Sequence, residues 1–274
     1  MKANIKVLFF AFALLLTALC LVACNTSDLE VPDQNPPEEN AQQLEFYPLS
    51  DGTYAVSAGK AKFLEQIDIP ANYGGKAVTV IAPDAFLGCK NLVSITIPNT
   101  IIEIGSYAFA NCENLSEILI PDSLKEMGES AFYNCTNLTR VSLGGGVAAI
   151  EERAFAYCKS ISLITVDEEN TTFKSVGHCL ISSQSKTLVV GCKDSIIPSD
   201  GSVTTIGKAA FYGCTELKTI GIPIQIMKIE DAAFSNCSNL AAVSYGGDAY
   251  TWELIEFGIS NFELLEAELN YTQN

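Results

Sequence analysis

The sequence predicts a β-rich solenoid, a stack of similar coils in which each coil covers the apolar side of its neighbour. The main observation is the motif Ala-Phe-x-x-Cys, which occurs six times in one fixed phase. Consecutive copies are 23 residues apart, except for one interval of 56, which exceeds the period by 33. In addition, 48% of the residues are hydrophobic and only 18% are charged, which suits many thin buried layers.

The N-terminus has the pattern of an export signal. Lys2 and Lys6 precede an apolar run at residues 7–23, as the positive and hydrophobic regions of a signal peptide do. The run has about 17 residues, the lower limit for spanning a bilayer, so an uncleaved membrane helix is the alternative. We therefore predict that residues 1–23 are a signal peptide.

The end of this run, Leu21-Val22-Ala23-Cys24, resembles the bacterial lipobox. The resemblance implies cleavage before Cys24 once that cysteine carries a covalent lipid. The exported chain would then be anchored to the cell membrane or outer membrane and face the exterior. Residues 24–43 would be the lipidated cysteine and a tether, because this acidic, proline-containing segment cannot bury enough apolar surface to order itself.

Each coil is expected to contain two inward-facing strands and a turn. Residues 92–97 alternate between inward and outward positions, and Pro98 ends the strand because it has no N–H for the ladder. Residues 102–104 form a second, shorter stretch, after which Gly105 permits a corner.

The Ala-Phe-x-x-Cys motif should place one ring and one thiol per coil in the interior. The ring enters from a helical or 3₁₀ turn, and the cysteine closes the turn as a small buried group. The predicted repeat core is Phe86, Cys89, Phe109, Cys112, Phe132, Cys135, Phe155, Cys158, Phe211, Cys214, Phe234 and Cys237.

The pattern resembles the BspA-like class of leucine-rich repeat, L-x-x-I-x-I-P-x-x-V-x-x-I-G-x-x-A-F-x-x-C, over residues 63–245. The resemblance implies a leucine-rich-repeat solenoid: a right-handed coil of short parallel strands and short helical or 3₁₀ turns. The longer interval resembles that family's hairpin-bearing long repeat, with one inserted hairpin at about residues 167–200. Residues 44–90 would be the N-terminal cap and first repeat, residues 91–245 the repeats, and residues 246–274 the C-terminal cap and tail.

Outward-pointing residues of the long strands should form one continuous face along about eight coils. Leu119, Arg140 and Leu163 are the expected anchors near its middle, because arginine and apolar groups ringed by neutral contacts are typical of hot spots. The convex side, the hairpin and the caps remain alternatives. The candidate binding residues are Ser94, Thr96, Glu117, Leu119, Arg140, Ser142, Leu163 and Thr165, with further rungs at Gln66/Asp68, Thr219/Gly221 and Ala242/Ser244.

The repeat cysteines should form a column of buried thiols, because parallel side chains point the same way rather than at each other. Cys179 and Cys192 flank a hairpin turn expected at residues 182–186. In an exported protein they could form a disulfide, and two unpaired thiols are the alternative.

Nothing in the sequence assembles into a catalytic or metal site. His178 is the only histidine and has no nucleophile motif nearby, and the acidic run at residues 167–170 lacks the alternating carboxylates of a calcium loop. We therefore expect no cofactor, no small-molecule substrate and no enzymatic activity.

The net charge of −16 argues against nucleic-acid binding, which needs Lys and Arg to neutralise phosphates. The leading hypothesis is therefore a membrane-tethered surface protein that binds another protein. The family resemblance implies adhesion to host matrix proteins or to other bacteria. Glycan binding is the alternative, although the expected face offers no exposed aromatic platform, and an exported enzyme is the remote one.

Overall fold

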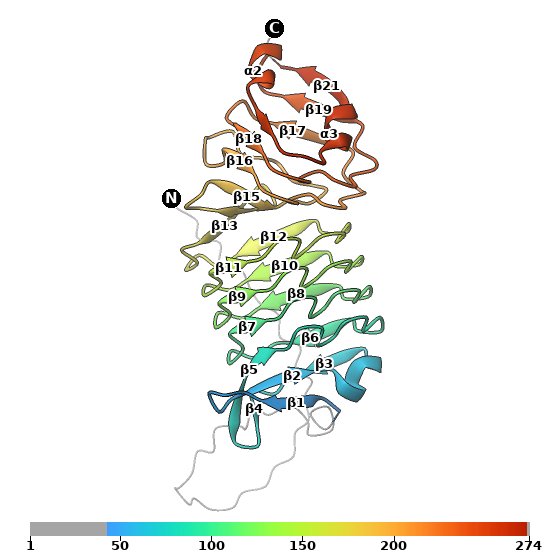
Figure 1. Ribbon diagram of the computed structural model, residues 1–274, viewed down its shortest axis with the longest axis vertical. Coiled ribbons are helices and arrows are strands. Elements are labelled where there is room, and N and C mark those ends of the chain that lie inside the picture. The colour runs from blue at the N-terminus through green and yellow to red at the C-terminus, as the bar shows by residue number, and fades with distance from the viewer. Residues whose placement is uncertain (1–42, 273–274) are drawn as a thin grey trace, which may run out of the picture. The chain divides into compact units, whose positions relative to one another are not determined.

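The computed structural model describes residues 43–272, which form a β-solenoid of about nine turns with mostly parallel strands (Figure 1). The predicted fold class is therefore confirmed, with about one turn more than expected. The predicted signal peptide at residues 1–23, the lipidated Cys24 and all but the last residue of the tether lie outside the described residues.

Long strands supply one side of every coil except the inserted one and pair in three sheets, β3-β6, β8-β10-β12 and β17-β19-β21. Proline ends the pairing after some of them, as at Pro121, because it has no N–H to donate, whereas Gly144 N still donates to Ile120 O at 3.0 Å. These strands are β3 (Gln66–Asp68), β6 (Ser94–Thr96), β8 (Glu117–Ile120), β10 (Arg140–Leu143), β12 (Leu163–Val166), β17 (Thr219–Ile222), β19 (Ala242–Tyr245) and β21 (Glu268–Tyr271).

Short strands line a second side of the coils and continue the parallel ladder from turn to turn. Before the long interval they are β5 (Lys76–Ile81), β7 (Glu103–Ile104), β9 (Glu126–Met127) and β11 (Ala149–Ile150). After it they are β16 (Thr205–Ile206), β18 (Lys228–Ile229) and β20 (Glu256–Phe257).

At the N-terminal end, an antiparallel hairpin of β1 (Glu45–Pro48) and β2 (Tyr54–Ser57) covers the edge of the short-strand sheet by pairing β2 with β5. The 3₁₀ helix η1 (Gly59–Phe63) follows, and β4 (Asn72–Tyr73) folds back on β5. Phe46 stacks on Tyr73 with ring centroids 4.0 Å apart. This arrangement gives the first coil the cover that an open solenoid end requires.

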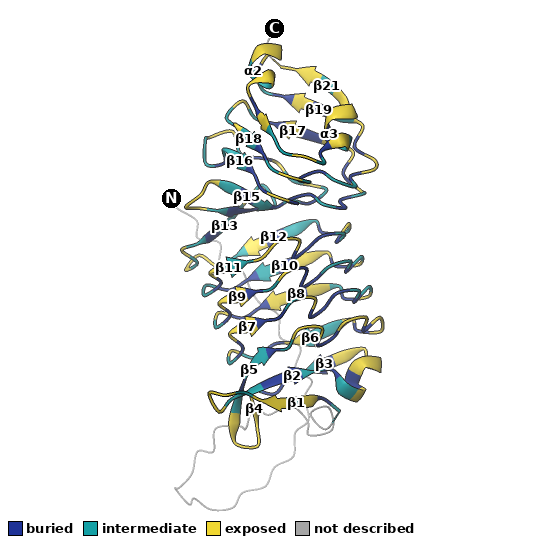
Figure 2. Cartoon of the chain, in the orientation of Figure 1, coloured by how far each residue is buried: buried dark blue, intermediate teal, exposed yellow. Residues whose placement is uncertain are grey.

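The repeated phenylalanines and cysteines occupy the interior, as predicted (Figure 2). Phe86, Phe109, Phe132 and Phe155 stack nearly parallel, with centroids 5.0–5.3 Å apart, and Phe211 stacks on Phe234 at 4.8 Å. The thiols also have a polar function that the sequence did not indicate. The Sγ–H of Cys112, Cys135, Cys158 and Cys237 donates to the phenylalanine carbonyl of the preceding coil at 3.0–3.2 Å.

The turn that carries each Ala-Phe pair differs from the predicted helical or 3₁₀ turn. It is a succession of β-turns, with hydrogen bonds such as Ala110 N to Tyr107 O and Cys112 N to Phe109 O. Left-handed residues interrupt any helix two positions before and two positions after each phenylalanine; around Phe109 they are Tyr107 (φ 56°) and Asn111 (φ 61°). Asparagine and glycine tolerate this region best, which explains their use at the second position.

The physical reason for glycine at position 105 differs from the one expected. A Cβ there would lie 2.4 Å from the backbone nitrogen of Pro83 in the preceding coil, and its φ is not left-handed. Gly128 is in the same position, 2.5 Å from the nitrogen of Ser106. Glycine is therefore required because adjacent backbones approach closely, and the corner itself would accept other residues.

The long interval holds two hairpins that share a strand, rather than the single predicted hairpin. Its antiparallel strands are β13 (Phe173–Val176), β14 (Cys179–Ser182) and β15 (Thr187–Val190), and β15 then pairs in parallel with β16. The turn at residues 183–186 agrees with the prediction, and the additional turn lies at Gly177 and His178, which are both left-handed.

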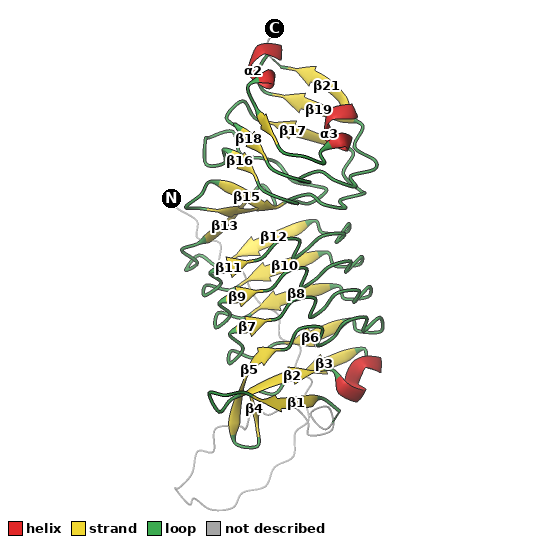
Figure 3. Ribbon diagram, in the orientation of Figure 1, coloured by secondary structure: helices red, strands yellow, loops and turns green. Residues whose placement is uncertain are grey.

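The stacking continues beyond residue 245, where the repeats were expected to end. The helices α2 (Ala249–Glu253) and α3 (Phe262–Glu266) are short (Figure 3), while β20 pairs with β18 and β21 pairs with β19. Asn261 takes over backbone pairing in this last coil: its Oδ1 accepts from Phe234 N at 3.0 Å, and its Nδ2 donates to Glu230 O at 2.9 Å. Residues 246–271 therefore form one more degenerate coil that also serves as a cap.

Candidate recognition face

The sheet β8-β10-β12 holds six of the eight predicted binding residues in register. Arg140 lies opposite Glu117 and Leu163, and Ser142 lies opposite Leu119 and Thr165. Residues that alternate with them along the strands, such as Ile118 and Val141, are buried. Because successive side chains of a strand point to opposite faces, the predicted residues point outward. We call the outer surface of these three strands the recognition face.

The recognition face is hollowed at the carboxyl ends of its strands. A groove of about 540 Å³ is lined by the exposed sides of Leu119, Ser142 and Thr165. Leu119 is 69% exposed. The hydroxyl of Thr165 donates to Ser142 Oγ at 3.0 Å, which orders the polar side of the groove.

One wall of the groove comes from residues that the sequence analysis did not select. Pro98, Pro121, Gly144 and Asp167 each follow a long strand, and all four line the groove. They are 23 residues apart, so the phase of the repeat could have identified them as one column. A carboxylate at Asp167 and another at Asp122 make this wall acidic.

The three expected anchors differ in their environment. Leu119 is free to contact a partner, whereas Leu163 is half-buried. Arg140 is exposed and forms an ion pair with Glu117, with a distance of 3.6 Å between guanidinium nitrogen and carboxylate oxygen. Such an exposed pair contributes little to stability, so Arg140 can exchange this partner for another at little cost.

The continuous face predicted along the whole solenoid is interrupted between β12 and β17, whereas β6 lies beside β8. Ser94 and Thr96 belong to the β3-β6 pair, opposite Gln66 and Asp68. The rungs Thr219/Gly221 and Ala242/Ser244 belong to β17-β19-β21, which adds a rung at Glu268 and Asn270. The shortened inserted coil separates β12 from β17, since the segment at residues 195–199, and not a long strand, lies beside residues 221–223.

The cysteines of the insert are free, buried thiols in this structure, which matches the alternative left open for them. Burial raises the pKa of Cys179 to about 12 and also raises the pKa of Cys192. A thiol of this kind stays protonated at neutral pH and is a poor nucleophile. The Oγ of Ser195 contacts Cys192 Sγ at 3.7 Å and the carbonyl of His178 at 3.3 Å.

Residues 43–272 contain no group of three or more His, Cys, Asp or Glu side chains placed to hold a metal ion. His178 lies in a β-turn, and Asp167 uses its Oδ1 to accept from Glu169 N at 2.9 Å. Over the same residues, no helix combines the length and the apolar character needed to cross a bilayer.

Comparison with known proteins agrees with the repeat geometry. The family model described as "BspA type Leucine rich repeat region (6 copies)" matches residues 59–183 and 190–266. The crystal structure of the T. pallidum leucine-rich repeat protein superposes with a TM-score of 0.53 at 22% identity, over 84% of this chain and 91% of that one. No curated protein matches the chain.

Two further solved structures are more distant. A leucine-rich repeat protein from Eubacterium ventriosum has 16% identity and a TM-score of 0.49, over 76% of this chain and 71% of that one. The pneumococcal vaccine antigen PcpA has 15% identity and a TM-score of 0.44, over 84% and 86%.

Proposed function

Because the chain belongs to the BspA-type leucine-rich repeat family, we propose that it is an exported, lipid-anchored surface protein that binds another protein through the recognition face. The main support is Leu119, an apolar side chain that is 69% exposed and lines the groove together with Pro98 and Pro121. Apolar side chains that are exposed together along a groove and rimmed by polar residues are typical of a protein-binding surface. Arg140 next to it offers a guanidinium that can pair with a carboxylate of the partner.

Adhesion to a host or bacterial surface protein is the proposed biological setting. The repeat scaffold suits this function because its sheet holds the contact residues rigidly, and pre-organised contacts lose little entropy on binding. A glycan is the alternative ligand. Protein binding is favoured because no aromatic side chain lines the groove among the described residues, whereas sugars usually stack on such rings.

The binding proposal can be tested with a matched pair of leucine variants. The biotinylated full chain captures partners from host secretions and from bacterial surface extracts, and captured proteins are identified by mass spectrometry. Leu119→Asp should weaken capture of the partner at least tenfold, since it places a charge at a hot spot. Leu254→Asp is the control, because Leu254 is similarly exposed (64%) at the end of α2, away from the groove.

Equal capture by the wild-type chain and the Leu119→Asp variant would refute the recognition face. If capture is lost after enzymatic removal of glycans from the extract, the ligand is a sugar. The anchor is tested separately. Cys24→Ala should move the protein from the membrane fraction to the medium and abolish labelling with radioactive palmitate, and unchanged labelling would contradict lipidation at Cys24.

A further inference from the structure

The regular hydrogen bonds between coils are partly interrupted at one level, between the coil of Phe155 and the coil of Phe211, where Tyr157 N still donates to Tyr212 O at 3.0 Å. Elsewhere the N–H of the motif phenylalanine donates to an alanine carbonyl of the next coil at 2.7 Å, as Phe132 does to Ala154, or, for Phe234, to Asn261 Oδ1 at 3.0 Å. The equivalent acceptor for Phe155 is the carbonyl of Ala210. That carbonyl is taken by Gly191 N at 2.8 Å.

The inserted coil causes this interruption because it is too short. Leu188 of the inserted coil pairs with Ile206 of the next coil. Cys192 lies four residues after Leu188, whereas Cys214 lies eight residues after Ile206. The missing residues are those that would carry an Ala-Phe pair. Gly191 passes directly over the ring of Phe211, with room for no side chain, since a Cβ would lie 2.1 Å from the ring.

Backbone donors are left without partners at this level. No backbone carbonyl among residues 43–272 accepts from the N–H of Arg153 or of Phe155, although the equivalent groups of Ser130 and Phe132 are both paired. Buried N–H groups in folded proteins are almost always hydrogen-bonded. The Phe155 N–H is therefore available to an acceptor from outside the chain.

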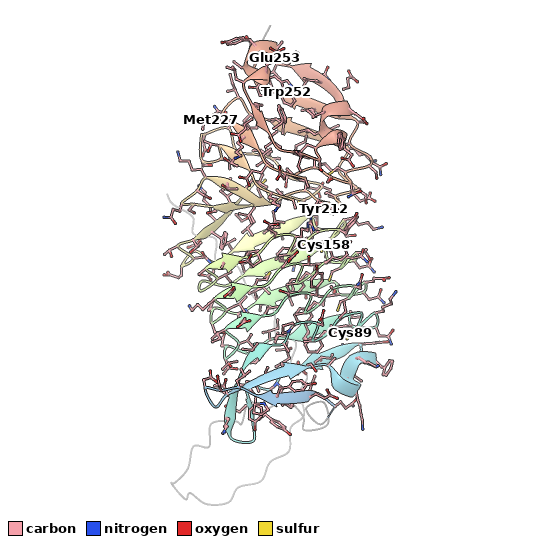
Figure 4. All side chains as sticks on the ribbon, in the orientation of Figure 1. Cys89, Cys158, Tyr212, Met227, Trp252 and Glu253 are labelled. Atoms are coloured by element: carbon pink, nitrogen blue, oxygen red, sulfur yellow. The ribbon has the colours of Figure 1, made fainter. Side chains whose placement is uncertain are left out.

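A cavity of about 240 Å³ opens at the same place. Its lining includes Phe155, Phe211 and, from β15, Val189. Phe155 is 7% exposed and Cys158 is also 7% exposed, whereas Phe132 and Cys135 one coil earlier are fully buried. We call this cavity the seam cleft; Cys158 and Tyr212, which both line it, are labelled in Figure 4.

The rim of the seam cleft carries more carboxylates than cations. Lys208 forms an ion pair with Glu152 at 2.8 Å, and its backbone N–H donates to Glu230 at 3.0 Å. The guanidinium of Arg153 lies 5.2 Å from the ring centre of Tyr212. Because Glu151 also lines the cleft, this rim disfavours an anionic ligand and favours a neutral acceptor such as an amide carbonyl.

We propose that the seam cleft binds an aromatic side chain of a peptide, whose ring lies against Phe155 and Val189 and whose carbonyls accept from the N–H groups of Arg153 and Phe155. The peptide replaces the Ala-Phe pair that the inserted coil lacks. Offset or parallel aromatic contacts contribute beyond area burial, so a phenyl ring is a better occupant than an aliphatic group of equal size. This site is independent of the recognition face.

The probe is N-acetyl-L-phenylalaninamide, a neutral compound with one ring and two carbonyls. Ligand-observed NMR with the full chain should give a dissociation constant of about 1 mM, the range expected for a fragment of this size. N-acetyl-L-alaninamide, which lacks the ring, should show no binding up to tenfold higher concentration. Benzyl alcohol, which lacks the carbonyls, should bind at least threefold more weakly than the full probe.

Val189→Trp should fill the seam cleft from β15 and weaken binding of the probe at least tenfold. Val176→Trp is the matched control, because Val176 is 40% exposed in β13 and does not line the cleft, so its binding should equal that of the wild-type chain. Unchanged binding by Val189→Trp, or no binding by the wild-type chain at 10 mM probe, would overturn the proposal. Equally tight binding of benzyl alcohol would overturn the pairing with the backbone N–H groups.

Discussion

The phenylalanine stack makes a quantitative prediction about two rings that are chemically identical. Phe132 is fully buried and stacks on Phe109 at 5.0 Å and on Phe155 at 5.3 Å. Phe132→Ala removes both contacts and leaves a cavity enclosed by two coils, which should cost about 3–5 kcal/mol of unfolding free energy. Its effect should extend to both neighbouring coils, because solenoid stability rests on nearest-neighbour interfaces.

Phe155→Ala should cost less, for a reason specific to the seam cleft. Phe155 stacks on Phe132 only, and its other side faces the cleft, so one aromatic pair is lost instead of two. An aromatic pair contributes about 0.5–1.5 kcal/mol beyond burial. The new cavity would also join an existing one, which reduces the additional cavity penalty. We therefore expect Phe155→Ala to be about 1–2 kcal/mol less destabilising than Phe132→Ala.

Urea unfolding followed by far-UV circular dichroism and by tyrosine fluorescence measures this difference. The two probes should be fitted together, because a stack of coils can unfold in parts. If both variants lose the same free energy, Phe155 is packed on both sides in solution and the seam cleft is closed. An unchanged unfolding curve for Phe132→Ala would contradict the buried stack itself.

Two further predictions concern buried polar groups. Burial raises the pKa of Cys179 and Cys214 to about 12 from 9.0, so the unfolded chain loses these protons first and the free energy of unfolding should fall as pH rises from about 9 to 12. Melting curves of a Cys179→Ala, Cys214→Ala variant should show a smaller fall over that range, and an identical pH profile would contradict the raised pKa values. Asn261→Ala should cost about 1–3 kcal/mol, because it leaves Phe234 N and Glu230 O unpaired. Hydrogen exchange should then accelerate at Phe234 and remain unchanged at Phe109, and equal exchange at Phe234 would argue against this capping function.

Much of the site was predictable because strand alternation is a local property. The register that places Ser142 between Leu119 and Thr165 follows from the 23-residue period, and the structure reproduces it. The hollow beside these residues was not predictable in the same way. Gly144 lines it, and a Cβ there would lie 2.6 Å from Asp122 N, so the two backbones approach closely at this point.

Some errors arose where one residue type serves two physical purposes. Gly105 was interpreted as a corner residue, but it is required by the backbone of Pro83 in the preceding coil. The repeat cysteines were interpreted as small buried groups, and thiols such as Cys135 also donate to a carbonyl of the preceding coil. A single sequence gives the type of each residue but not its neighbours in space. At these positions the contact with the preceding coil explains the choice of residue.

The sequence by itself determined that this chain is a solenoid, since a fixed period of Ala-Phe-x-x-Cys can bury its rings and thiols only by stacking equivalent coils. Only the tertiary structure decided where that stack is interrupted. The inserted coil has an apolar pattern of its own in the sequence. Only the three-dimensional structure shows that it is too short, because there Gly191 lies between Phe155 and Phe211. The physical reason is that the period fixes contacts between equal coils, whereas the fit of an unequal coil depends on three-dimensional packing with both neighbours.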